Sequence, residues 1–103
     1  MISPGSDKEI LMEKEHLIIT VIGEDRKGIV ASVSGFLYKH YINIEDISQK
    51  IMGSYFVMMM LVSMKDSDRG IEEVRDGLNA IGKELNVQIQ IQHENIFKMM
   101  HRV

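Results

Sequence analysis

The residues best suited to binding a ligand lie in one short polar segment, GEDRKGIV, at positions 23–30. Asp25 carries a carboxylate that can cap a helix or bind an ammonium group, and Arg26 can pair with a carboxylate through two hydrogen bonds. Gly28 allows the backbone to approach a ligand closely. If a helix begins after Gly28, its first N–H groups are unpaired and the positive end of its dipole can hold an anion. The segment is therefore a candidate site for a small molecule that carries a carboxylate.

The same residues have a plainer interpretation. Asp25 can serve only as a helix cap, and Gly28 only as a turn residue, because Asp and Gly before a helix are common. Judged on residue types alone, this plainer interpretation is favoured.

Other kinds of site chemistry have no support in the sequence. The chain has no cysteine, which excludes thiolate nucleophiles, disulfides and cysteine-based metal sites. Its four histidines do not occur at the spacings of zinc-binding motifs, and no nucleophile elbow, phosphate loop or catalytic triad can be recognised. We therefore expect no metal, no cofactor and no catalytic activity. The histidines are His16, His40, His93 and His101.

The charge balance argues against a nucleic-acid partner. Twelve Lys and Arg residues against 15 Asp and Glu residues give a net charge of −3, whereas binding to nucleic acid depends on neutralising phosphates. The segment 53–57 (GSYFV) faintly resembles an RNA-recognition motif, but Met52 stands where that motif has a basic residue and Met59 where it has another aromatic. We expect no nucleic acid among the partners.

The hydropathy pattern argues against membrane insertion. No apolar run approaches the roughly 20 residues that span a bilayer, and the first residues are too polar for a secretory signal. We therefore expect a cytoplasmic protein that does not bind membranes. With 103 residues the chain can form one domain, which we place at 15–92, after a tail at 1–14 and before a C-terminal helix at 93–103.

Hydrophobic periodicity predicts six elements and a terminal helix. Alternating or continuous apolar runs indicate strands, and apolar residues spaced by three and four indicate helices. The expected strands are 16–23, 43–51, 55–64 and 87–92, and the expected helices are 29–41, 71–85 and a short one at 96–100. The order β-α-β-β-α-β defines an α+β fold, the ferredoxin-like split βαβ sandwich, with a short C-terminal helix.

Three features of the expected strands predict their positions in the sheet and the need for a partner on one face. The alternation of the second strand slips at Glu45–Asp46, which indicates a bulge. The third strand is apolar on both faces and should be central, whereas the glutamines of 86–92 (NVQIQIQ) indicate an edge strand. Because two helices can cover only one face, the other apolar face needs cover, from the terminal helix, a partner subunit or both. We therefore expect a homo-oligomer, most simply a two-fold dimer.

The segment ITVIGEDRKGIVASVSGFLYKHYINIEDIS resembles the opening of an ACT domain. The resemblance lies in the loop pattern Asp-Arg-x-Gly-Ile/Val and in the Asn-Ile entry into the second strand. It extends over residues 15–92 and includes the ACT domains of the glycine cleavage system transcriptional repressor. The tail is similar to that of small stand-alone ACT proteins.

The resemblance implies a non-catalytic regulatory module. ACT domains bind amino acids or similar metabolites between two domains, so the expected function is binding of a small metabolite, an amino acid, at a homodimer interface, with a regulated protein as a further partner. The alternative is a ligand-free dimerisation or protein-interaction module. Many relatives have proline where this chain has Lys27, which implies a less rigid loop. The implied ligand-binding residues are Asp25, Arg26, Gly28 and Ile29 from one subunit, with Asn43 and Ile44 from its neighbour.

Overall fold

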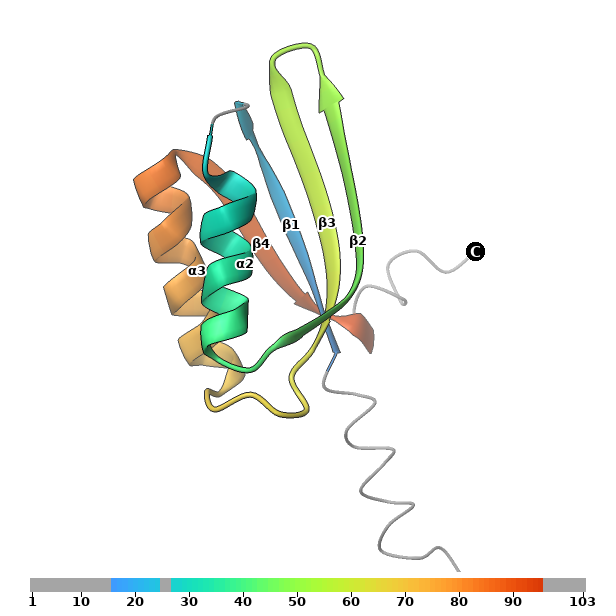
Figure 1. The fold of residues 1–103 in the computed structure, drawn as a ribbon, viewed down its shortest axis with the longest axis vertical. Helices are drawn as coiled ribbons and strands as arrows, with labels where there is room; N and C mark the ends of the chain where they lie inside the picture. Colours follow the sequence, from blue (N-terminus) through green and yellow to red (C-terminus); the bar gives the residue numbers. More distant parts are fainter. Residues whose placement is uncertain (1–15, 25–26, 96–103) are drawn as a thin grey trace, which may run out of the picture.

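The computed structural model describes residues 16–24 and 27–95 (Figure 1). The elements follow the order β-α-β-β-α-β, so the predicted fold class is confirmed. They are β1 (His16–Glu24), α2 (Ile29–Lys39), β2 (Asn43–Met52), β3 (Tyr55–Ser63), α3 (Ile71–Leu85) and β4 (Val87–His93).

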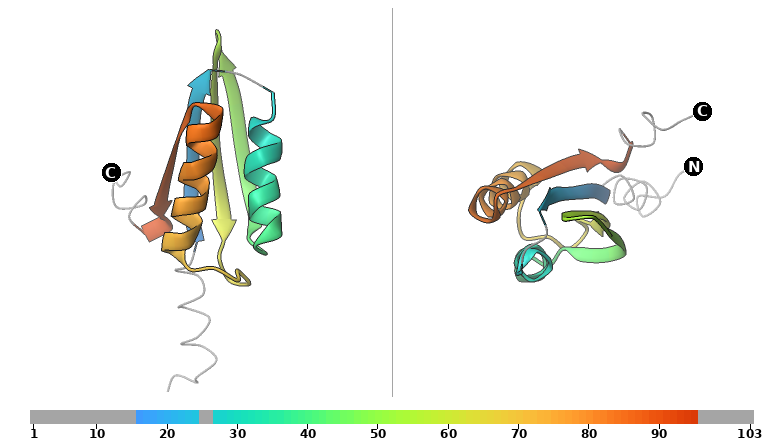
Figure 2. Two further views of the ribbon diagram at one scale, coloured as in Figure 1. Left: turned by 90° about the vertical axis from the view of Figure 1, so that its left-hand side faces the viewer. Right: turned by 90° about the horizontal axis from the view of Figure 1, so that it is seen from above.

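The four strands form one antiparallel sheet in the order β2-β3-β1-β4. Both helices lie on the same face of this sheet, with α2 beside β2 and β3 and α3 beside β4 (Figure 2). The predicted positions of β3 as a central strand and β4 as an edge strand are confirmed. The second edge strand is β2, which leaves its outer backbone groups available for pairing.

The core lies between the sheet and the two helices. Alternate residues of the strands point towards the helices because side chains in a strand alternate between faces. On β3 the residues facing the helices are Phe56, Met58, Met60 and Val62, each at most 5% exposed. They pack against apolar residues of both helices, among them Val33, Leu37, Val74 and Leu78.

The hairpin of β2 and β3 contains the predicted bulge and turns at a glycine. The register between β2 and β3 shifts between Ile44 and Asp46, which confirms the predicted bulge. Gly53 adopts a φ of 64° in the turn that joins the strands, a conformation that favours glycine.

The first helix is shorter than its apolar spacing predicted. It ends at Lys39, and Tyr41 lies beyond it, 66% exposed, with a φ of 59°. The apolar spacing placed Tyr41 on the buried stripe of the helix, which is wrong. The chain reverses direction here because the N–H of Ile42 donates to the carbonyl of Leu37 at 2.9 Å, closing the helix.

The last strand ends one residue beyond its predicted end. β4 continues to His93, and residues 94–95 begin a helical turn. The helix predicted from Ile96, Phe97 and Met100 lies outside the described residues, so the predicted boundaries at 14 and 92 stay predictions.

The large apolar side chains left exposed form two patches. Four lie on the open face, which we define as the side of the sheet away from the helices. The other five lie on the β2 flank, formed by the outer side of α2, the turn that follows it and the helix-facing side of β2. The open-face set is Ile22, Met52, Tyr55 and Met59, and the β2-flank set is Val30, Tyr38, Tyr41, Ile47 and Ile51.

Candidate functional site

The first part of the predicted site lies at the N-terminus of α2. Gly28 precedes the helix with a φ of 91° and a ψ of −5°, and Ile29 begins it with only 2% of its surface exposed. The first turn contains no acidic residue, and within the described residues no side chain caps it. The first N–H groups of this turn have no partner within the helix and can donate to an anion. Asp25 and Arg26 lie outside the described residues.

Gly28 also has a purely structural role. Its φ lies in the left-handed region, where a residue with a Cβ is strained, although no atom of the described residues beyond its chain neighbours lies within 4 Å of that Cβ. The turn therefore favours glycine with or without a ligand. A substitution at Gly28 changes the backbone as well as any site, so it cannot by itself reveal binding.

The second part of the predicted site lies at the other end of the same helix. Asn43 and Ile44 begin β2, after α2 has run its 11 residues away from Gly28 (Figure 1). At a rise of 1.5 Å per residue the two parts are about 16 Å apart. One chain does not bring them together.

A groove of about 390 Å³ lies beside Asn43, a volume within the range of small-molecule sites. We call it the Asn43 groove. The sequence did not single out its other polar or aromatic residues. Its lining residues are Tyr38, Lys39, Tyr41, Ile42, Asn43 and Asp66.

The two tyrosines of the Asn43 groove are unusually exposed. Tyr38 has 85% of its surface accessible and Tyr41 66%. The available signal in the sequence was their spacing, since Tyr38 lies off the apolar stripe of the helix and Tyr41 follows it by three residues. That spacing alone did not show that Tyr41 lies past the end of the helix.

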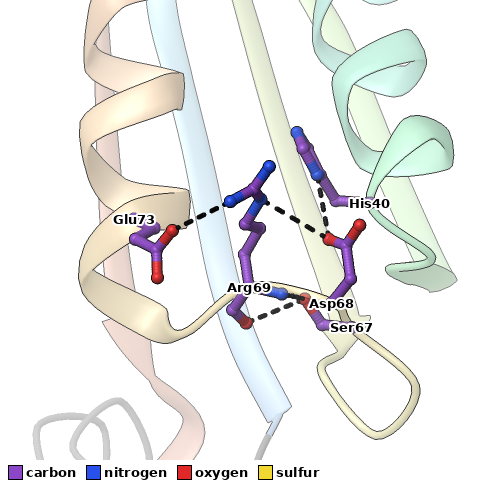
Figure 3. A network of polar contacts seen from close by, with 5 residues as sticks. All are labelled: His40, Ser67, Asp68, Arg69 and Glu73. Atoms are coloured by element: carbon purple, nitrogen blue, oxygen red, sulfur yellow. Dashed lines mark hydrogen bonds and ion pairs between the residues drawn. The ribbon is translucent and has the colours of Figure 1, made fainter.

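A network of polar contacts fixes the loop that carries Asp66 (Figure 3). The ring of His40, 9% exposed, places Nδ1 3.0 Å from Oδ1 of Asp68, whose N–H donates to the carbonyl of His40 at 3.2 Å. Ser67 ties the loop together locally, since its hydroxyl donates to the carbonyl of Arg69 at 2.9 Å and accepts from the N–H of Arg69 at 3.1 Å. The network joins the end of α2 to the loop before α3.

The remaining polar clusters and grooves contain none of the predicted site residues that the structure describes. His16 lies between two carboxylates, with Nε2 2.9 Å from Oε1 of Glu45 and Nδ1 3.5 Å from Oε2 of Glu94. Across residues 16–24 and 27–95, no three His, Cys, Asp or Glu side chains are arranged to hold a metal ion. A larger groove of about 700 Å³ lies between α3 and β4, and its lining includes Asn79, Lys83 and Gln88.

No helix in the described part of the chain is both long enough and apolar enough to cross a bilayer.

Proteins of similar sequence and structure are known. A UPF0237 protein from Methanopyrus kandleri is 45% identical over 86 residues, which cover 84% of this chain and 96% of the relative. The structure of an ACT domain protein from Streptococcus pneumoniae is 44% identical, with a TM-score of 0.70, and the match covers 81% of this chain and 93% of that one. The structure of a candidate glycine cleavage system transcriptional repressor is 30% identical, with a TM-score of 0.67, and the match covers 75% of this chain and 44% of that one.

The family model described as "ACT domain" matches residues 15–92. The resemblance noted in the sequence is thereby confirmed, together with its extension to the ACT domains of the glycine cleavage repressor. With its topology, its relatives and most of its length in agreement, the chain belongs to the ACT domain family, whose members are regulatory ligand-binding modules.

Proposed function

We propose that this protein is a non-catalytic regulatory module that binds an amino acid between two copies of itself. The proposal rests on one observation: the predicted site residues lie at opposite ends of α2. A two-fold partner can supply the missing end in each of two equivalent sites.

The edge strand β2 is where such a partner would pair. An antiparallel contact between β2 and its copy continues the sheet to eight strands and sets α2 antiparallel to the partner's α2. The start of β2, with Asn43, then lies next to the N-terminus of the partner's α2, with Gly28. This arrangement assembles Gly28, Ile29, Asn43 and Ile44 without any change within the chain.

The surface chemistry of the two sheet edges favours β2. The β2 flank exposes Val30, Tyr38, Tyr41, Ile47 and Ile51, and burial of apolar area drives association. The other edge strand, β4, and the helix α3 beside it carry none of the large apolar side chains that are left exposed.

The site matches the two charged groups of an amino acid. The free N–H groups at the start of α2 and the guanidinium of Arg26 suit the carboxylate. Asp25 and the side-chain amide of Asn43 suit the ammonium group. Ile44, half buried at the start of β2, adds apolar contact.

The experiment combines light scattering with a thermal-shift screen against the twenty common amino acids. We expect the mass of a dimer and a concentration-dependent rise in melting temperature with one or a few amino acids, because a ligand that binds only the folded state stabilises it. Asn43→Ala should reduce that rise, whereas Asn79→Ala, an exposed amide on α3, should not. A monomer, or a wild-type protein that responds to none of the amino acids, contradicts the proposal.

The open face supports a second candidate function, a ligand-free interaction module. Ile22, Met52, Tyr55 and Met59 expose apolar surface there that a regulated protein can cover. A dimer that responds to no amino acid, and whose association with a partner protein is lost in Met59→Glu, would favour this second function.

A further inference from the structure

Tyr41 adopts a backbone conformation that is unfavourable for its residue type. Its φ of 59° lies in the left-handed region, where glycine is common after a helix and a bulky residue is rare. Packing of the ring does not offset this unfavourable backbone energy, since 66% of the residue is exposed. A strained residue that contributes little to the core is a reason to look for a functional role.

The surroundings of Tyr41 indicate what that role is. The Asn43 groove has Tyr38 and Tyr41 among its lining residues, together with Asn43, which belongs to the proposed amino-acid site. The left-handed turn at Tyr41 is also what directs the chain from α2 into β2, so Tyr41 and Asn43 are positioned by the same turn.

We infer that Tyr38 and Tyr41 bind the side chain of the ligand, and that Asp66 joins Asn43, which lines the same groove, in binding its ammonium group. The inference rests on the proposed function and specifies the ligand as a free amino acid with an uncharged, apolar or aromatic side chain. Tyrosine rings offer flat apolar surface to such a side chain, and aromatic pairs add specific attraction.

The charges around the groove agree with this ligand class. Lys39 and Asp66 contribute one charge of each sign, so the groove has no net charge that would favour an acidic or basic side chain. The C-terminus of α2 carries the negative end of the helix dipole, which adds to the attraction of Asp66 for an ammonium group. A zwitterion with an uncharged side chain is the best match.

Asp66 is held in place by contacts that do not involve the ligand. The loop that carries it is joined to α2 by the N–H of Asp68, which donates to the carbonyl of His40 at 3.2 Å, and by the contact between their side chains at 3.0 Å. The N–H of Ser67 donates to the carbonyl of Met64 at 3.1 Å. Binding therefore does not have to order this part of the site.

The test compares Tyr41→Gly with wild type in the thermal-shift screen. Glycine relieves the strain, so we expect the melting temperature of the free protein to hold or to rise, by up to about 4–8 °C. The ligand-dependent rise should nevertheless be lost, because the ring that contacts the ligand is gone. If Tyr41 only shaped the turn, Tyr41→Gly would keep both the melting temperature of the free protein and its rise with ligand.

Asn86→Gly is the matched control. Asn86 also ends a helix in the left-handed region, with a φ of 57°, but it lies at the end of α3, away from the Asn43 groove. We expect this variant to keep the whole ligand-dependent rise. Asp66→Asn should lose most of it, and the 2-hydroxy acid analogue of the responding amino acid, which lacks the ammonium group, should produce no rise with wild type.

Four results would overturn the inference. A full ligand response in Tyr41→Gly, a full response in Asp66→Asn, or a wild-type response confined to acidic or basic amino acids would each do so, while the proposed regulatory function would stand. A wild-type protein that responds to none of the amino acids would overturn both the inference and the proposed function.

Discussion

At the scale of single residues, glycines and one tyrosine decide how closely the elements of this domain can approach and where the chain turns. Gly77 in α3 faces α2, where a Cβ built on it would lie 2.4 Å from the ring of Phe36. That ring in turn packs edge-on against His40, with 4.7 Å between the ring centres. From sequence alone Gly77 only weakens a helix, whereas the structure shows that it allows the two helices to pack.

We therefore expect Gly77→Ala to destabilise the protein. Displacing the Phe36 ring lowers the free energy of unfolding by about 1–3 kcal/mol, and the better helix propensity of alanine raises it by about 1 kcal/mol. The net loss of stability should be about 1 kcal/mol. Urea unfolding at a fixed protein concentration measures it. Gly35→Ala is the matched control, because nothing lies within 4 Å of its Cβ, and it should stabilise α2 by up to about 1 kcal/mol. Equal effects of the two substitutions would show that packing at Gly77 is unimportant.

At the scale of elements, the two edge strands differ in the side chains around them. On β2, Ile47 and Ile51 remain 44% and 59% exposed although they point to the helix-covered face of the sheet. On β4 no large apolar side chain is left exposed. This difference is the physical reason for choosing β2 as the dimer contact.

Ile47→Glu tests that choice. Ile47 lies near the middle of β2, so a two-fold contact would bring two new carboxylates close together and remove apolar area. We expect the dimer dissociation constant to rise at least about tenfold, or by about 1.4 kcal/mol, measured by light scattering over a dilution series. Gln90→Glu adds the same charge to β4 and should leave the mass unchanged. Dissociation in Gln90→Glu but not in Ile47→Glu would place the dimer contact at β4 or on the open face, because Gln90 pairs with Thr20, which pairs with Met59.

At the scale of the whole molecule, the two exposed apolar patches point in different directions. The open face looks away from both helices, whereas the β2 flank extends the edge of the sandwich (Figure 2). A domain with two such patches can form a dimer with one and keep the other for a regulated protein. That arrangement would allow ligand binding between subunits to be coupled to a contact elsewhere.

Met59→Glu tests whether the two patches act independently. Met59 lies on the open face and is 39% exposed, so the charge should be tolerated with little change in folding. We expect the dimer mass and the ligand-dependent rise in melting temperature to match wild type, as measured by light scattering and thermal shift. If Met59→Glu dissociates the dimer, the open face is the subunit interface and the β2 flank is not.

The sequence by itself determined the order of the elements, the bulge in β2, the central place of β3 and the edge position of β4. These follow from local periodicity, because the faces of a strand or a helix are set by side-chain spacing along the chain. The loop pattern around Gly28 and the Asn-Ile entry at Asn43 were also sufficient to identify the family.

Only the tertiary structure decided how residues distant in sequence are combined. The ends of α2 lie too far apart for one chain to unite Gly28 with Asn43, and the periodicity that placed Tyr41 on the buried stripe cannot report that the helix has already ended. Asp66 reaches the groove because Asp68 joins its loop to His40, a contact across 28 residues. Such contacts depend on the path of the chain in space, which local spacing does not encode.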